Sequence, residues 1–218
     1  MRPVGDHAVL LELADNASVH IAARAVRARF PDELVEVVPG DCTLLLVWDE
    51  DLEDPAALLS NLKALAGDAS AFKLDKRAIG TDRAAIGTDQ PEVVTVPVKY
   101  DGADLEAVAA TLGVSVEEVV TLHSGATYTV AFVGFAPGFP YLKPEEPSRL
   151  LELPRLATPR TEVPAGSVAV AAGYCGIYPR SSPGGWNLLG RTGVVLFDAE
   201  RQPPALLEPG TRVRFEPV

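Results

Sequence analysis

The sequence has few of the residues on which metal and redox sites depend. Its 218 residues include only two cysteines, Cys42 and Cys175, which lie far apart and match no metal or redox spacing such as CxxC. We therefore expect no metal site in the chain. An isolated cysteine is more often a small buried residue than a reactive one, and we expect this of Cys42, whereas Cys175 adjoins a glycine-rich motif.

Positive charge and long apolar runs are also scarce. Lysine and arginine number 19 against 30 aspartates and glutamates, which gives a formal net charge of −11, and such a chain is repelled by phosphate backbones and by anionic lipid. No apolar run approaches the roughly 20 residues of a membrane-spanning helix, and the amino terminus lacks the apolar region of a signal peptide. We expect a cytoplasmic protein that binds neither nucleic acid nor membranes.

Signatures of independent hydrolysis or nucleotide binding are missing as well. There is no GxSxG nucleophile elbow, no HExxH zinc motif and no GxxxxGK[ST] phosphate loop. The run from Ser181 to Gly185 invites comparison with the nucleophile loop of amidases, but no lysine or histidine lies near it in the sequence to act as a base. We therefore expect the chain to be inactive alone.

Apolar spacing and turn residues divide the first 67 residues into a β-α-β-β-α order. Pro39, Gly40 and Asp41 form a turn between two β-rich runs, which predicts a hairpin. Asp54 is a good helix cap and Pro55 suits the first helical position. This order predicts a small two-layer α/β domain of the ferredoxin-like type. The predicted elements are strands at 7–13, 34–38 and 42–48 and helices at 19–30 and 55–67.

A repeated pentapeptide marks the middle of the chain. Ala-Ile-Gly-Thr-Asp occurs at 78–82 and again at 85–89, in a stretch with no apolar periodicity. Repeats this short cannot stack as a solenoid, and we interpret the stretch as a linker. The predicted organisation is an N-terminal domain at 1–77, a linker at 78–91 and a C-terminal domain at 92–218.

The C-terminal part begins with a strand and two short helices and continues with short β-like runs. Pro97 places the first strand at an edge or bulge. One helix ends at Gly113, and the next opens with Ser115 and Glu118 at the spacing of a capping box. Many short strands with glycine- and proline-rich connections predict a closed barrel or a sandwich. The predicted strands are 93–100, 127–133, 167–171, 194–197 and 211–215.

Three segments concentrate glycine, proline, aromatic residues and arginine. The first, 134–142, has two glycines, two prolines and three aromatics in nine residues, so we expect a stiff loop with aromatic walls. The second, 158–171, places Arg160 in a polar loop before a strand. The third, 176–192, joins a Ser-Pro-Gly-Gly-Trp turn to Arg191. Together these features predict a small-molecule pocket.

Candidate site residues come mainly from these segments. Arg160 and Arg191 have the planar donor geometry that suits the carboxylate of a small acid, and the alternative is that each pairs with an internal acidic residue or a neighbouring subunit. His123 lies near the end of a predicted helix and is a candidate acid or base, and the alternative is a buried histidine that caps the helix. The other predicted pocket residues are Phe139, Tyr141, Tyr178, Ser182, Gly184, Gly185 and Trp186.

The three motifs, in this order and spacing, resemble the family called 5-oxoprolinase B subunit, allophanate hydrolase subunit 1 or KipI, a carboxyltransferase domain with subdomains C and D that also occurs in urea carboxylase. The resemblance runs from Gly5-Asp6 to Pro209-Gly210. It implies an N-terminal α+β domain and a C-terminal cyclophilin-like β-barrel. One departure is Tyr174-Cys175, where relatives commonly carry Gln-Thr.

The resemblance also implies a function. The chain would pair with the C subunit, which is allophanate hydrolase subunit 2-like, and work with the A subunit, which is similar to lactam-utilisation proteins. The complex would open the small lactam 5-oxoproline to glutamate with ATP, which we expect to be bound outside this chain, and we expect a heterotetramer of this subunit with the C subunit. Alternatives are a KipI-like inhibitor of a histidine kinase, or a urea carboxylase-type carboxyltransferase role, which needs a biotin carrier.

Overall fold

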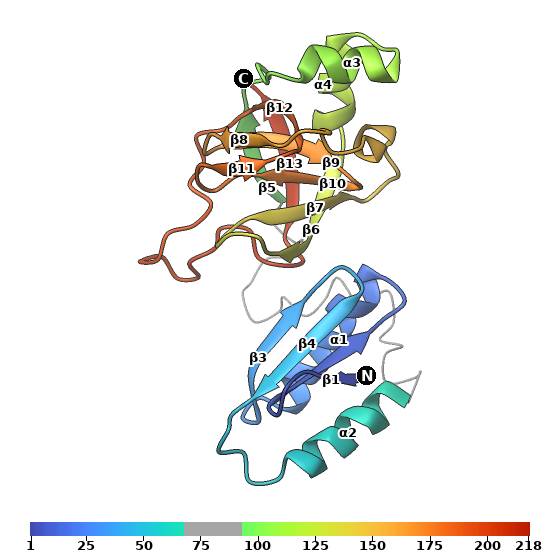
Figure 1. Cartoon of the computed structure of the whole chain (residues 1–218), viewed down its shortest axis with the longest axis vertical. Helices are drawn as coiled ribbons and strands as arrows, with labels where there is room; N and C mark the ends of the chain where they lie inside the picture. The colour runs from blue at the N-terminus through green and yellow to red at the C-terminus, as the bar shows by residue number, and fades with distance from the viewer. Residues whose placement is uncertain (68–92) are drawn as a thin grey trace. The chain divides into compact units, whose positions relative to one another are not determined.

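The computed structural model describes residues 1–67 and 93–218 (Figure 1). The chain divides into two compact units, Met1–Pro91 and Glu92–Val218, which have separate hydrophobic cores. The linker predicted at 78–91 lies outside the described residues, so the predicted domain boundaries stay predictions. Both units combine helices with strands, which confirms the predicted mixture of α and β structure.

The N-terminal unit has a four-stranded antiparallel sheet with the order β1-β2-β4-β3 (Figure 1). Two helices share a hydrophobic core with one face of this sheet. The predicted β-α-β-β-α order is therefore confirmed, with one short strand added before it. The elements are β1 (Arg2–Pro3), β2 (Ala8–Glu12), α1 (Asn16–Arg29), β3 (Leu34–Pro39), β4 (Thr43–Trp48) and α2 (Pro55–Gly67).

Local capping explains where the two helices begin. The Asp15 carboxylate accepts a hydrogen bond from the backbone N–H of Ser18 at 2.7 Å, and the Asp54 carboxylate accepts one from the backbone N–H of Ala57 at 2.9 Å.

Cys42 lies in the hairpin turn before β4 and is exposed, so the expectation of a buried thiol at this position is wrong. The residues of the core are Val9, Leu11, Val19, Ala22, Ala23, Val26, Phe30, Leu44, Leu46, Trp48, Leu58 and Leu62.

The C-terminal unit is built on a seven-stranded sheet with the order β12-β9-β10-β7-β6-β13-β5. All neighbours are antiparallel except β13 and β5, and a separate pair is formed by β11 and β8. The elements are β5 (Val93–Val98), α3 (Leu105–Leu112), α4 (Val116–Ser124), β6 (Thr127–Val133), β7 (Pro140–Pro144), the 3-10 helix η2 (Arg149–Glu152), β8 (Arg160–Val163), β9 (Ser167–Ala171), β10 (Tyr174–Ile177), β11 (Ser182–Gly184), β12 (Asn187–Arg191) and β13 (Arg212–Pro217).

The two outermost strands of this sheet meet, so the sheet curls round on itself. Lys99, which follows β5, and Arg191, at the end of β12, exchange two backbone hydrogen bonds of 2.9 Å each. The next residues continue the contact, because the N–H of Gly102 donates to the Leu189 carbonyl at 3.1 Å. We call this junction the seam. Its backbones approach so closely that a Cβ atom on Gly190 would overlap the carbonyl of Lys99.

Pro97 lies in β5, the last strand in the sheet order, as predicted, and Ser115 accepts the predicted capping hydrogen bond from Glu118 at 3.1 Å. The strand expected at 194–197 is wrong, because that segment makes only an isolated bridge between Phe197 and Ala205. The glycine- and proline-rich motifs contain the predicted strand 167–171, which is β9, and also the short strands β8, β11 and β12, which were not predicted.

The described parts of the chain contain no helix with the length and apolar character needed to cross a membrane. Within residues 1–67 and 93–218 there is likewise no group of three or more histidine, cysteine, aspartate or glutamate side chains arranged to hold a metal ion.

The close approach of the backbones at the seam leaves no room for a side chain at Gly190. Gly190→Ala would force a methyl group into the backbone of Lys99, and overpacking of this kind costs about 1–3 kcal/mol of unfolding free energy. Gly193→Ala is the matched control, because a Cβ atom at Gly193 meets nothing within 4 Å. Urea unfolding followed by Trp186 fluorescence in a Trp48→Phe background measures both. Equal midpoints for the two variants would contradict this account of the seam.

Candidate functional site

Aromatic side chains gather on one face of the seven-stranded sheet. Successive residues of a strand point to opposite faces, so Val168 and Val170 of β9 belong to the main core whereas Ala169 and Ala171 belong to a second cluster. The small side chains of these alanines leave room for large rings. We call the rings of Phe139, Tyr141, Tyr174, Tyr178 and Trp186 the aromatic face.

Phe139 lies at the centre of the aromatic face. Its ring centroid is 5.2 Å from that of Tyr141, 5.1 Å from that of Tyr178 and 5.6 Å from that of Trp186, in tilted or edge-to-face geometry. Gly176 makes this packing possible, because a Cβ atom there would lie 2.8 Å from the Trp186 ring and 3.0 Å from the Phe139 ring.

The β8–β11 pair lies against the aromatic face and brings in the glycines of the third motif. A Cβ atom on Gly184 would overlap the Tyr178 hydroxyl, and a Cβ atom on Gly185 would lie 3.5 Å from the Pro159 ring. Ser182 pairs with Val163, a buried member of the same cluster. The structure therefore brings together the predicted pocket residues Phe139, Tyr141, Tyr178, Ser182, Gly184, Gly185 and Trp186.

Most of the aromatic face is closed to solvent in the isolated chain. Phe139, Tyr178 and Trp186 are buried, and Tyr141 is half-buried. Burial raises the pKa of the Tyr141 and Tyr178 hydroxyls, so both remain neutral at physiological pH. A ligand can reach Tyr141 directly, but contact with the other three rings needs a rearrangement of their neighbours. Their role in binding stays a prediction.

Arg160 has an internal partner. Its Nη2 donates to the Asp104 carboxylate at 2.6 Å, and the other oxygen of that carboxylate accepts from the backbone N–H of Leu188 at 2.7 Å. Asp104 is itself buried, so the pair is a structural link between β8 and β12. Arg160 Nη1 is buried without a hydrogen-bond partner. This geometry matches the internal-pairing alternative, and a contact of Arg160 with substrate stays a prediction.

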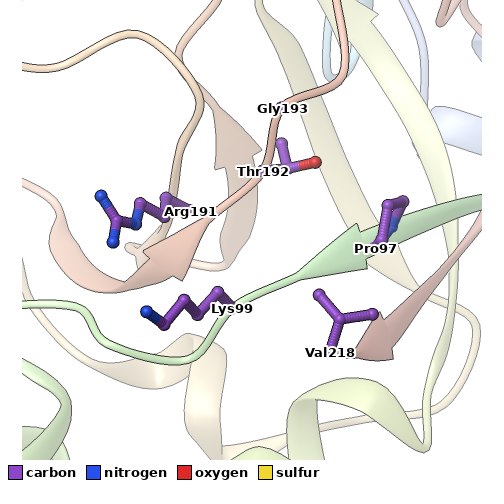
Figure 2. A pocket seen from close by; sticks show the side chains of 6 residues that line it. All are labelled: Pro97, Lys99, Arg191, Thr192, Gly193 and Val218. Carbon is purple, nitrogen blue, oxygen red and sulfur yellow. The ribbon is translucent and has the colours of Figure 1, made fainter.

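Arg191 lies at a pocket of about 430 Å³ that we call the basic pocket. Figure 2 shows Arg191 and Lys99 extending from adjacent segments toward the same side. Asp101 lies 2.9 Å from Arg191 Nη2 and 3.4 Å from Lys99 Nζ, so two positive charges share one negative charge. The exposed fractions of the two cationic side chains are 64% and 61%. The pocket is lined by Pro97, Lys99, Arg191, Thr192, Gly193 and Val218.

His123 is buried in the main core of the C-terminal unit. Its Nδ1 is 2.7 Å from the Tyr100 hydroxyl and its Nε2 is 3.2 Å from the Cys175 thiol, while its ring stacks on Phe215 at 4.4 Å. Burial lowers the pKa of His123 to about 3, and burial raises the pKa of the Cys175 thiol. His123 has no exposed surface, so the predicted acid or base role requires the core to open.

Sequence reasoning missed three residues that the site includes. Lys99 lines the basic pocket, and Asp101 pairs with Arg191, only because the seam brings the residues after β5 to β12, and no local pattern signals that pairing. Arg155 is exposed, and its positive charge partly offsets the effect of burial on the pKa of Tyr141 and Tyr178. An arginine in an irregular segment carries no signal by itself.

Comparison with known proteins places the chain among named relatives. A family model described as carboxyltransferase domain, subdomain C and D, matches residues 1–207. The 5-oxoprolinase B subunit of Escherichia coli O157:H7 is 38% identical over 223 residues, which cover 98% of this chain and 94% of that protein. The protein of the same name from Bacillus subtilis (strain 168) is 35% identical, with 97% and 90% covered.

Solved structures agree with this assignment. The crystal structure of TTHA0988 is 37% identical with a TM-score of 0.76, and the match covers 98% of this chain but only 40% of that longer chain. The urea carboxylase of Kluyveromyces lactis is 21% identical with a TM-score of 0.66 and matches this chain over 21% of its own length. At that identity the likeness concerns the fold alone.

The buried state of His123 predicts a pH dependence of stability. The pKa of about 3 in the folded chain is below the ordinary value of 6.5, so the unfolded chain takes up a proton first as the pH falls. Stability from this group is therefore complete above pH 6.5 and is lost toward pH 3, at about 1.4 kcal/mol per pH unit.

Urea unfolding of the wild-type chain and of His123→Gln between about pH 7 and about pH 4 measures this contribution. Both proteins have the same carboxylates, so the effect of acid on those groups cancels when the two stability curves are compared. We expect a smaller loss of stability with acid in the variant. An identical slope in the two proteins would show that His123 is accessible to protons in the folded state.

Proposed function

Because the chain belongs to the family of carboxyltransferase domains with subdomains C and D, we propose that it is the B subunit of a 5-oxoprolinase-type hydrolase. The observation that carries this proposal is identity of 35–38% to three proteins of that name over nearly the whole of this chain. The match also covers at least 90% of each of those proteins, so the relatives have little sequence that this chain lacks.

The proposed reaction is the opening of 5-oxoproline to glutamate, driven by ATP and carried out together with the A and C subunits. Opening a stable lactam with ATP is simplest if the amide oxygen is phosphorylated before water attacks. The present chain carries no phosphate-loop motif, so we propose that the nucleotide is bound elsewhere in the complex. In this scheme the chain recognises and orients the substrate within a pocket that it shares with its partner.

The basic pocket is the proposed place for the substrate carboxylate. Arg191 and Lys99 are exposed and carry two positive charges against the single negative charge of Asp101, which leaves an excess positive charge for an anion. The antiparallel seam fixes the backbone positions of both cations, so the backbone needs no further ordering when the ligand binds. Arg160 is less suited, because Asp104 already occupies one edge of its guanidinium group.

We also propose that the N-terminal unit is ferredoxin-like and that the C-terminal unit is a cyclophilin-like barrel. In the N-terminal unit, β2, β3 and β4 follow one another along the chain in the order expected of a ferredoxin-like domain. In the sheet they lie in the order β2-β4-β3, and β1 takes the edge position beside β2. The curled sheet of the C-terminal unit, with its seam between Lys99 and Arg191, supports the cyclophilin-like barrel.

The carboxyltransferase alternative has weaker support. A putative urea carboxylase from Emericella nidulans is 29% identical over 107 residues, which is 46% of this chain and 9% of that protein. A KipI-like role in kinase inhibition would need a kinase-binding surface, and it becomes the leading alternative if the complete complex fails to open 5-oxoproline.

The first test is reconstitution. The chain is combined with purified A and C subunits, and glutamate release from 5-oxoproline is measured with ATP, then again with each component omitted. We expect release only from the complete mixture. A stably assembled complex that releases no glutamate would refute the oxoprolinase assignment, whereas release without this chain would show that it is not an essential component.

The Arg191 side chain gives a sharper test within the active complex. Removing a hydrogen bond to a charged group costs about 1.5–3 kcal/mol, so Arg191→Ala should raise KM for 5-oxoproline by roughly 10- to 100-fold with little change in KM for ATP. The backbone bonds of the seam do not depend on this side chain. Arg149→Ala is the control, because Arg149 makes an exposed ion pair with Glu118 away from the basic pocket. Equal KM values in the two variants would exclude Arg191 from the substrate site.

A further inference from the structure

Phe135 is a large aromatic residue that the fold holds in solvent. The exposed fraction of this residue is 64%, and its φ of +66° lies in the left-handed region that favours glycine. The surrounding loop closes on itself, because the N–H of Gly134 donates to the Phe139 carbonyl at 3.2 Å and the N–H of Phe139 donates to the Ala136 carbonyl at 3.0 Å. A residue that is both strained and exposed contributes little to folding, and such positions concentrate at functional sites.

A second loop holds two more apolar side chains in solvent. Val195 is 63% exposed and Phe197 is 38% exposed, on either side of the buried Leu196. Arg201 fixes this loop, because its guanidinium group donates to the backbone carbonyls of Val195 at 3.2 Å and Leu196 at 3.1 Å. The same group also reaches the backbone carbonyls of two prolines, Pro203 and Pro204. The loop is therefore internally bonded and presents its two exposed apolar side chains in a fixed arrangement.

The two loops touch one another. Gly138 has a φ of +75°, and a Cβ atom there would lie 2.7 Å from the Cβ of Phe197 and 3.2 Å from the carbonyl oxygen of Leu196. Phe135 and Phe197 therefore stand on contacting loops, and we call Phe135, Val195 and Phe197 the apolar knob. Phe135 also packs edge-on against Phe139 at 5.5 Å, so the knob borders the aromatic face.

Charge decides which kind of partner fits the knob. Asp198 and Glu200 are exposed on the same loop, and the whole chain carries a net charge of −11. A second copy of the chain would bring like charges together, which disfavours self-association. A suitable partner has an apolar groove with a basic rim. Relatives named as a B subunit imply other subunits, and this chain matches only 40% of the longer chain of TTHA0988.

We propose that the apolar knob of Phe135, Val195 and Phe197 is the docking surface for the C subunit. This inference rests on the proposed function, because it assumes a hydrolase built from several different chains. Rigid aromatic residues at the centre of an interface supply most of its binding energy, and preorganised loops reduce the entropy cost of association. The partner would also cover the border of the aromatic face near Tyr141, and so close one side of the shared substrate pocket.

Phe135→Gly is the decisive variant. Glycine accepts a φ of +66°, so the folded chain should be retained, while the aromatic contact with the partner is lost. We expect Phe135→Gly and Phe197→Ser each to weaken binding to the purified C subunit, with a loss of at least about 30-fold as measured by isothermal titration calorimetry. Val35→Ser is the matched control, because Val35 is 62% exposed on β3 of the N-terminal unit, and its affinity should equal that of the wild type.

The outcomes separate this inference from the proposed function. If both knob variants bind the C subunit as tightly as the wild type does, the knob is not the docking surface, and the proposed function is unaffected. A wild-type chain that does not bind the C subunit overturns both. Dimerisation of the chain alone, abolished by Phe135→Gly, would assign the knob to a second copy and also overturn the proposal. Loss of binding in the knob variants, with normal thermal unfolding and normal binding by Val35→Ser, supports it.

Discussion

The C-terminal unit depends on the pairing of Lys99 with Arg191, because this pairing joins the two outermost strands of its sheet. Unpaired strand edges expose backbone donors and acceptors, and the seam satisfies those of Lys99 and Arg191 within the chain. Directly opposed residues in an antiparallel pair also place their side chains on the same side, about 4.5–5.5 Å apart at Cβ. Closure of the sheet therefore creates the basic pocket as well, and Asp101 relieves the repulsion between its two cations.

Alternation along the seam connects the pocket to the interior. Lys99 and Asp101 reach solvent, whereas Tyr100 between them points inward and bonds to His123, which in turn meets Cys175. Cys175 is followed by the glycine on which the Phe139 and Trp186 rings pack. A continuous set of contacts therefore runs from the basic pocket through the core to the aromatic face, so that both parts of the candidate site share one rigid framework.

Local patterns predicted the parts of the fold that local forces determine. The caps at Ser115 and Asp54, the hairpin turn and the edge position of Pro97 follow from nearby residues, and the structure has them. The strand 167–171 inside the second motif was predicted, but β8, β11 and β12 were missed, because they pair with segments that are not their neighbours in the sequence. The concentration of glycine, proline and aromatic residues identified the motifs and thereby the aromatic cluster, but it could not reveal that Arg160 is committed to Asp104, since that pair spans 56 residues.

The contrast between the two cysteines has a practical consequence. Cys42 stands in an exposed hairpin turn of the N-terminal unit, while Cys175 is enclosed in the core of the C-terminal unit. A thiol-reactive fluorophore added to the folded wild-type protein should therefore attach to one unit at one position, with no engineered residue. In the Trp48→Phe background, energy transfer from Trp186 to such a dye would report the distance between the two units in solution, and its change when the complex assembles.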